Sequence, residues 1–311
     1  MQWRYKFNGC ETMKIVVPNY YKEFQCIASA CRHSCCIGWE IDIDSATYSY
    51  YGSIGGDIGE RLKECTAVND GQAHFILDKN ERCPFLNSNG LCDIITECGE
   101  ESLCDICADH PRFRNFFSDR TEIGLGLCCE AAAKLILGFD RPFRLEVIED
   151  DGEQVELYED EITFAKDFEN AISVAQDKSI SFSDRCEKIL KMFSTSLPDY
   201  SPLEWADFYS SLERLDSEWE KCLEYLGGCQ QLVTDSVDEQ TAENLLCYFL
   251  LRHMASALDD GDVASKVGFA VLSCKVILTL ARLIGAEEAA RMYSSEIEYS
   301  DENIGEILKL F

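Results

Sequence analysis

Residues 31 to 129 carry a dense cysteine pattern: Cys31-x3-Cys35-Cys36, Cys65, Cys83-Pro84-Phe85-Leu86, Cys92, Cys98, Cys104-x2-Cys107 and Cys128-Cys129. This stretch holds eleven of the eighteen cysteines in the 311-residue chain. Paired and closely spaced thiols at this density indicate either a metal site or a disulfide framework. That choice decides what holds the N-terminal part of the chain together.

The N-terminus favours the metal site. The segment formed by the first twelve residues is short and polar, and it lacks the apolar region and small-residue cleavage site of a secretory signal. We therefore expect a cytoplasmic protein. In a reducing cytosol disulfides are rare and clustered thiols usually bind metal. In an exported protein, a disulfide-stapled interaction domain would be the better interpretation.

Two segments within the pattern have the local geometry of metal ligands. The turn residues Asn87-Ser88-Asn89-Gly90 lie between Cys83 and Cys92 and predict that these two thiols come close together. Two residues separate Cys104 from Cys107, so both thiolates can bind one ion without backbone strain. Zinc takes four such ligands in a tetrahedron and an iron–sulfur cluster takes three or four thiolates. Spacing alone leaves both metals open.

The chain is strongly acidic, with a formal net charge of −29. The charge is −7 over residues 1 to 129 and −22 over residues 130 to 311. A surface this negative repels phosphate backbones, so we expect no nucleic-acid partner. A basic protein or peptide is the better electrostatic match for the C-terminal half.

Hydrophobic patterning predicts an α+β protein. A cysteine-rich, metal-binding N-terminal part with short strands is expected over residues 14–140, an acidic hairpin or linker over 141–160, and a mostly α-helical domain over 161–311. One long helix is predicted from an apolar stripe at spacings of three and four. The stripe comprises Trp205, Phe208, Leu212, Leu215, Trp219, Cys222 and Leu226.

The longest apolar run is Val267 to Ile284. Lys275 and Arg282 lie within it, and a charged side chain is costly at membrane depth. The run therefore predicts a buried core helix, without membrane insertion.

Longer motifs surround the cysteines, and together they resemble the flagellin lysine-N-methylase family. They are Cys31-x3-Cys35-Cys36-x-Gly38-Trp39, the Ile41/Asp44/Tyr48 segment, Cys83-Pro84-Phe85-Leu86, Leu91-Cys92-Asp93-Ile94, Leu103-Cys104-x2-Cys107, Pro111-Arg112, and Cys129 before an alanine-rich helix. The cysteine core is also similar to small zinc- or iron-chelating cysteine-cluster domains.

The resemblance implies an enzyme, a protein-lysine N-methyltransferase of the bacterial flagellum. Its expected substrate is flagellin and its expected methyl donor is S-adenosyl-L-methionine. It also implies a 4Fe-4S cluster, with Zn²⁺ as the alternative. The expected metal ligands come from Cys31, Cys35, Cys36, Cys83, Cys92, Cys104, Cys107 and Cys129. The alternative function is a non-catalytic zinc- or iron-binding module that engages a protein partner.

Catalytic residues are not identified by any motif. Asp42, Asp44 and Tyr48 are candidates for the base that deprotonates a lysine amine, only because they lie near the cysteines in sequence. Two routes stay open, a polar displacement on the sulfonium methyl and a reaction in which the cluster binds or reduces the donor. Cys65, Cys98 and Cys128 have weaker claims as ligands. The sequence carries no signal for an oligomeric state.

Overall fold

The computed structural model describes residues 14–152, 155–232 and 238–311. Within these residues the chain forms two compact units, each built from separate stretches of sequence. The cysteine-rich unit comprises Gln25–Arg112 together with Cys129–Ala131, and the helical unit comprises the rest of the described chain. Residues 14–140, predicted as one cysteine-rich domain, thus contribute to both units.

A small antiparallel sheet lies within the cysteine-rich unit, with strand order β2-β4-β3. Its strands are β2 (Asp42–Ile43), β3 (Thr66–Asn69) and β4 (Gln72–Phe75). Asp70 and Gly71 join β3 to β4, and both have positive φ angles, of 49° and 87°. An Asp-Gly pair with this backbone makes the tight turn whose twist matches that of the paired strands.

Short helices and a mixed apolar and thiol core complete the cysteine-rich unit. The helices are η2 (Ala28–Ala30), α1 (Ser45–Ser53), α2 (Gly56–Glu64), α3 (Asp93–Cys98), η3 (Glu100–Ser102) and α4 (Asp105–Asp109). The core gathers Tyr51, Phe75 and Phe85 around the buried thiols of Cys83 and Cys104. Cys83 and Cys104 therefore fill the core as small buried side chains.

Gly59 allows α1 and α2 to follow one another closely. A Cβ atom on Gly59 would lie 2.1 Å from the backbone oxygen of Ile54. We expect Gly59→Ala to lower the free energy of unfolding by about 1–3 kcal/mol, because the backbone must move to accept the methyl group. Urea unfolding followed by circular dichroism measures this effect. Gly52→Ala is the matched control, since nothing lies within 4 Å of its added Cβ, and equal stability of the two variants would contradict the prediction.

The helical unit contains a four-stranded sheet with strand order β5-β6-β1-β7. The strands are β1 (Lys14–Pro18), β5 (Arg112–Phe116), β6 (Thr121–Leu125) and β7 (Leu145–Asp150). β1 runs parallel to β6 and antiparallel to β7. β7 is the first half of the predicted acidic hairpin; residues 153–154 of that segment lie outside the described residues, and residues 155–157 are not a strand.

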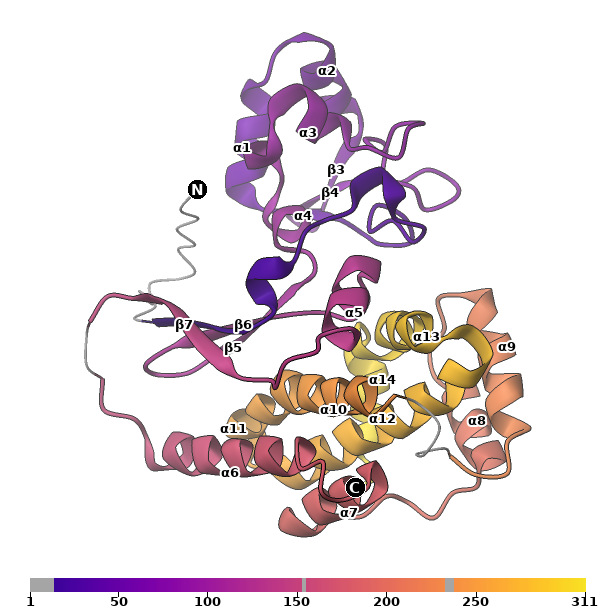
Figure 1. Ribbon diagram of the computed structural model, residues 1–311. Helices are drawn as coiled ribbons and strands as arrows, with labels where there is room; N and C mark the ends of the chain where they lie inside the picture. The colour runs from indigo at the N-terminus through magenta and orange to yellow at the C-terminus, as the bar shows by residue number, and fades with distance from the viewer. Residues whose placement is uncertain (1–13, 153–154, 233–237) are drawn as a thin grey trace. The chain divides into compact units, whose positions relative to one another are not determined.

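Helices make up most of the helical unit, with α12 packed against α10 and α13 (Figure 1). The longer ones are α5 (Glu130–Leu137), α6 (Glu159–Ala175), α7 (Phe182–Met192), α8 (Pro202–Ser210), α9 (Ser217–Gly227), α10 (Glu239–His253), α12 (Val263–Ile284), α13 (Ala286–Tyr293) and α14 (Asp301–Leu308). Single turns are η1 (Tyr21–Glu23), η4 (Met254–Ser256), α11 (Ala257–Asp260) and the π-helical η5 (Ser294–Glu298). The predicted α+β class, with a mostly helical C-terminal part, is confirmed.

Among the described residues, α12 alone is long and apolar enough to cross a membrane. Most of its apolar stretch is buried inside the helical unit, and Lys266 near its start pairs with Asp260. The core helix predicted from Val267 to Ile284 is therefore confirmed.

The single helix predicted over residues 205–226 is wrong. The chain forms two helices, α8 and α9, which pack against each other. A remote carboxylate holds the break between them, because the backbone amides of Leu215 and Asp216 donate to Glu296 at 2.9 and 2.7 Å. Asp216 then caps α9 by accepting from the amide of Glu218.

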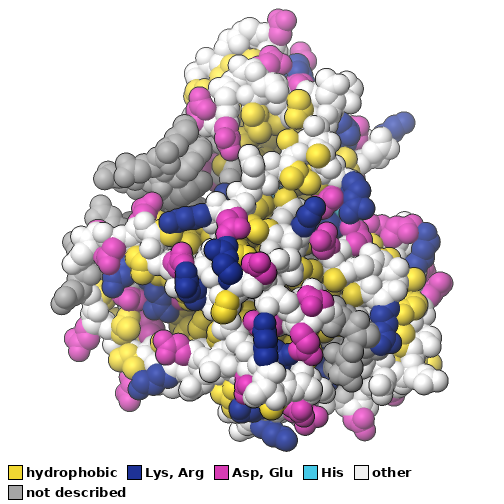
Figure 2. Space-filling model, viewed as in Figure 1, with side chains coloured by type: hydrophobic (Ala, Val, Ile, Leu, Met, Phe, Trp, Pro, Cys, Tyr) yellow, Lys and Arg dark blue, Asp and Glu magenta, His cyan; other side chains and the backbone are white. Residues whose placement is uncertain are grey.

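Acidic side chains are widely distributed. On the face shown in Figure 2, Asp and Glu side chains are interspersed with Lys and Arg rather than gathered in one patch. The excess negative charge of the C-terminal half is thus a diffuse field on this face.

Candidate metal centre

The turn between Cys83 and Cys92 forms as the sequence predicts. The amide of Asn87 donates to the carbonyl of Leu91 at 2.9 Å, and the Asn87 side-chain oxygen accepts from the amides of Asn89 and Leu91. Leu86 and Cys92 are bridged in antiparallel fashion. This local hydrogen bonding brings the two thiols close enough for Cys92 to raise the pKa of Cys83.

Cys36 joins this pair from an earlier segment. Its carbonyl accepts a hydrogen bond of 2.8 Å from the amide of Cys83, and Ile37 is bridged to Arg82 beside it. Arg82 is held in turn, because its guanidinium donates to the carbonyls of Leu86 and Asn87. Two stretches that are 47 residues apart therefore present thiols side by side.

Cys104 and Cys107 lie at the start of α4. Cys104 is the residue that precedes the helix, and its carbonyl accepts from the amide of Ala108 at 2.9 Å. The two thiols hydrogen-bond to each other. The Cys-x2-Cys spacing thus brings the two sulfurs together at the helical turn, and their binding of one ion stays a prediction.

Mutual contact separates the acidities of these thiols. The hydrogen bond from Cys107 lowers the pKa of Cys104 despite burial, and the same bond raises the pKa of Cys107. Likewise, the hydrogen bond from Cys35 lowers the pKa of Cys36 to about 7. Burial raises the pKa of Cys83 to about 12, and the neighbouring Cys36, Cys92 and Cys104 thiols add to that effect.

A second group of thiols adjoins the first through the Cys35–Cys36 hydrogen bond. It consists of Cys26, Cys31, Cys35 and Cys129. The Cys26 and Cys129 thiols are close enough to Cys35 to raise its pKa. Cys31 lies 3.7 Å from a carboxylate oxygen of Glu130. Glu130 also accepts from the backbone amide and the guanidinium of Arg32, which fixes Cys129 against the loop that carries Cys31.

The structure thus places all eight predicted ligands in the cysteine-rich unit. None of the seventeen described cysteines forms a disulfide. Among the described residues, no three or more His, Cys, Asp or Glu side chains are already arranged around one point as a metal site. The donor chemistry nevertheless fits a soft metal, because the neighbours are thiols and two of them, Cys36 and Cys104, have lowered pKa values. Their role as ligands stays a prediction.

The other cysteines are placed differently. Cys65 and Cys98 pack at the edge of the core of the cysteine-rich unit, and Cys128 is buried in the helical unit. Cys26 was not among the predicted ligands, although it lies beside Cys35. Its position five residues before Cys31 was the available sequence signal.

The three candidate bases have distinct surroundings. Asp44 caps α1 by accepting from the amide of Thr47 at 2.8 Å, and its second oxygen accepts from the amide of Asp105 at 3.1 Å. Burial raises the pKa of Asp44, but these hydrogen bonds outweigh burial and lower it overall. Asp44 therefore positions the start of α4 next to Cys104. Asp42 and Tyr48 are exposed.

Comparison with known proteins gives a family-level relation over part of the chain. No family model matches, and no solved structure matches significantly. The lysine-N-methylase of Salmonella typhimurium strain LT2 is 27% identical over 137 residues, which cover 40% of this chain and 32% of that protein. The lysine-N-methylase of Salmonella choleraesuis strain SC-B67 is 27% identical over 138 residues, with the same coverage.

A shorter relative matches a similar share of the chain. The flagellar biosynthetic protein FliU of Salmonella muenchen is 26% identical over 137 residues, covering 40% of this chain and 76% of that protein. The match spans about a third of the length of the two methylases. The resemblance expected from the cysteine motifs is confirmed, and this chain has distant homologues among proteins named lysine-N-methylase and FliU.

Proposed function

We propose that this protein is a lysine N-methyltransferase that acts on flagellin in the bacterial cytoplasm and requires a metal–thiolate centre. The distant homology to proteins named lysine-N-methylase carries the proposal. The gathering of eight cysteines in one compact unit supports the part that concerns metal. The whole activity is proposed here from relatives that the chain matches over about a third of their length.

The reaction sets two requirements for the chain. S-adenosyl-L-methionine supplies an electrophilic methyl group when bound. The lysine nitrogen must lose a proton before it can attack, since an unperturbed lysine has a pKa of about 10.4. A carboxylate or tyrosine near the amine, or solvent, would take that proton first, so that the nitrogen lone pair could form the N–C bond as the S–C bond breaks and the donor leaves as a neutral thioether. The protein then acts mainly by positioning the two reactants in line.

The thiols form the proposed metal centre. Cys36, Cys83, Cys92, Cys104 and Cys107 are the mutually close group, and an iron–sulfur cluster or a zinc ion would draw its ligands from this group and from Cys31, Cys35 and Cys129. A closed zinc site would stabilise the fold. A cluster with three thiolates would in addition leave one iron accessible.

Co-expression with flagellin tests the function. We expect flagellin recovered from cells that also express this protein to gain mass in steps of about 14 Da per methyl group on lysine. Intact mass measurement and peptide mapping read this out. The control is the double variant Cys104→Ser/Cys107→Ser, expressed in parallel. Unmodified flagellin from cells with soluble, metal-loaded protein would contradict the proposed activity and leave a non-catalytic metal-binding module.

A further inference from the structure

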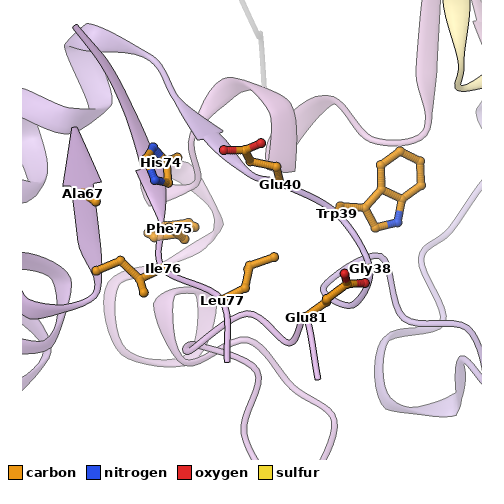
Figure 3. Close-up of a pocket in the computed structure, with 9 residues that line it drawn as sticks. All are labelled: Gly38, Trp39, Glu40, Ala67, His74, Phe75, Ile76, Leu77 and Glu81. Carbon is orange, nitrogen blue, oxygen red and sulfur yellow. The ribbon is translucent and has the colours of Figure 1, made fainter. Parts of the chain in front are cut away.

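A groove of about 540 Å³ opens on the cysteine-rich unit beside β4 (Figure 3). His74, Phe75 and Ile76 lie along one side, and Trp39 and Glu81 lie on the other. The remaining lining residues are Gly38, Glu40, Ala67 and Leu77. Ile76 is a large aliphatic side chain that stays 48% exposed at this groove. The apolar side chains along this groove leave room for an aliphatic side chain to pack against them.

The polar groups of the groove are mostly anionic. Glu40 and Glu81 are exposed, and neither carboxylate has a hydrogen-bond or ion-pair partner within the described part of the chain. The nine lining residues include two glutamates and one histidine but no lysine or arginine. A ligand that carries a positive charge and no negative charge therefore matches the groove.

The groove borders the paired segments that carry two of the thiols. The amide of Gly38 donates to the carbonyl of Glu81 at 3.0 Å, two residues from the point where Cys83 donates to Cys36. At about 3.3 Å per residue in extended chain, Glu81 lies about 7 Å along the backbone from Cys83, and Glu40 lies about 13 Å from Cys36. The groove and the candidate metal centre therefore share these paired segments.

The backbone conformation of Glu81 is stabilised by hydrogen bonds in its loop. Its φ is 56°, a left-handed conformation that a residue with a Cβ rarely adopts. Asp78 supports it, because the Asp78 carboxylate accepts from the amides of Asn80 and Arg82 at 2.7 and 3.1 Å. The loop therefore presents the Glu81 side chain at a defined place on the groove.

We propose that this groove binds the side chain of the substrate lysine, with Ile76 and Leu77 against the methylene stem and with the negative charge of Glu40 and Glu81, which both line the groove, attracting the ammonium group. The assignment rests on the proposed lysine methyltransferase function and names the residues that select its substrate. Lysine in a protein chain combines an aliphatic stem with one positive charge and no carboxylate. S-adenosyl-L-methionine and free amino acids bring a carboxylate, for which the lining offers no lysine or arginine.

Peptide binding to the full-length protein tests the assignment directly. The probe is the blocked peptide acetyl-Gly-Ala-Lys-Ala-Gly-amide, compared with the same peptide carrying norleucine or acetyl-lysine. Binding is measured by calorimetry and by NMR shifts of the groove amides. We expect the lysine peptide to bind about tenfold more tightly than either neutral analogue, because two carboxylates recognise its charge. Equal binding of the three peptides would overturn the proposal.

Substitution of the glutamates gives the second arm. Each of Glu40→Gln and Glu81→Gln should weaken lysine-peptide binding about threefold, and the double variant about tenfold, as for exposed ion pairs. Glu100→Gln is the control, since Glu100 is exposed in the same unit but outside the groove. An unchanged affinity in the double variant would overturn the assignment. Displacement of the peptide by S-adenosyl-L-methionine would show that the groove binds the methyl donor, and this too would overturn the assignment.

The two proposals can fail separately. If flagellin is methylated with the same kcat/KM by the double glutamine variant and by the wild-type protein, the groove assignment is wrong and the proposed function stands. If the lysine peptide binds as expected while flagellin stays unmodified, the groove assignment stands and the proposed function is wrong.

Discussion

Cys104→Ser is expected to remove most of the bound metal and to unfold the cysteine-rich unit. Cys104 is fully buried in the core of that unit, and its thiol is hydrogen-bonded to Cys107. Binding of a structural metal is worth about 10–16 kcal/mol in small domains that fold around zinc. A domain has only about 5–15 kcal/mol of net stability. Weakening the site through one ligand can therefore exceed the whole stability of the unit.

The measurement is metal content per chain, together with soluble yield and circular dichroism, after anaerobic purification. Cys222→Ser is the matched control, because Cys222 is equally buried but lies in the helical unit against Met292. The control should keep its metal. Cys→Ser replaces one small side chain by another, so the loss of packing alone is expected to be about 1 kcal/mol. Equal metal content in the two variants would show that Cys104 is not a ligand.

The same preparation identifies the metal. Iron–sulfur clusters colour a protein through thiolate-to-iron charge transfer, with broad absorbance near ~400 nm. Iron and sulfide together with that band are the result expected from the resemblance. A colourless protein that contains zinc would keep the thiol site and exclude the cluster.

The parts of the site that could be predicted from sequence are those made by local chemistry. The turn from Asn87 to Gly90 forms because Asn and Gly favour its backbone, and the turn alone determines that Cys83 and Cys92 approach. The Cys104–Cys107 pair is equally local. Helices in the C-terminal half were predictable from apolar periodicity for the same reason.

The parts that could not be predicted depend on distant partners. Cys129 joins the cysteine-rich unit only after the chain has passed through β5 and β6 of the helical unit, and the Glu130 side chain holds it there by bonding to Arg32. The periodicity of apolar residues in the sequence carries no signal that the chain returns to the cysteine-rich unit at Cys129. The break between α8 and α9 has the same origin, since the stripe of apolar residues continues while a carboxylate from Glu296 binds the backbone amides of the break.

The buried charge of Glu298 in the helical unit is another such long-range feature. Glu298, on the π-helical turn η5, accepts from the Tyr248 hydroxyl at 3.0 Å, from Nε2 of His253 at 2.8 Å and from Nε of Arg252 at 2.9 Å. All three partners lie on α10. The Glu298 side chain has no exposed surface. This carboxylate therefore attaches the C-terminal segment to the middle of the helical core.

We expect Glu298→Gln to lower the free energy of unfolding by about 3–5 kcal/mol, because the substitution leaves the Arg252 charge buried without its counter-charge. Urea unfolding followed by fluorescence of the buried Trp205 and Trp219 in the same unit reports it. Glu306→Gln is the control; its surface pair with Lys309 should contribute less than about 1 kcal/mol. Equal stability of the two variants would show that the buried network contributes little.

The pH dependence of the difference in unfolding free energy between wild type and Glu298→Gln gives an independent check. Burial raises the pKa of Glu298, but Arg252 and His253 outweigh burial and lower it below the ordinary value of 4.5. A lowered folded-state pKa means that the stabilisation is complete above the unfolded-state pKa and is lost as the pH falls through the folded-state value. The gap between wild type and Glu298→Gln should thus be widest above pH 4.5 and narrow below it. A gap that stays constant on acidification would mean that the amide disrupts packing and that the charge of Glu298 contributes nothing.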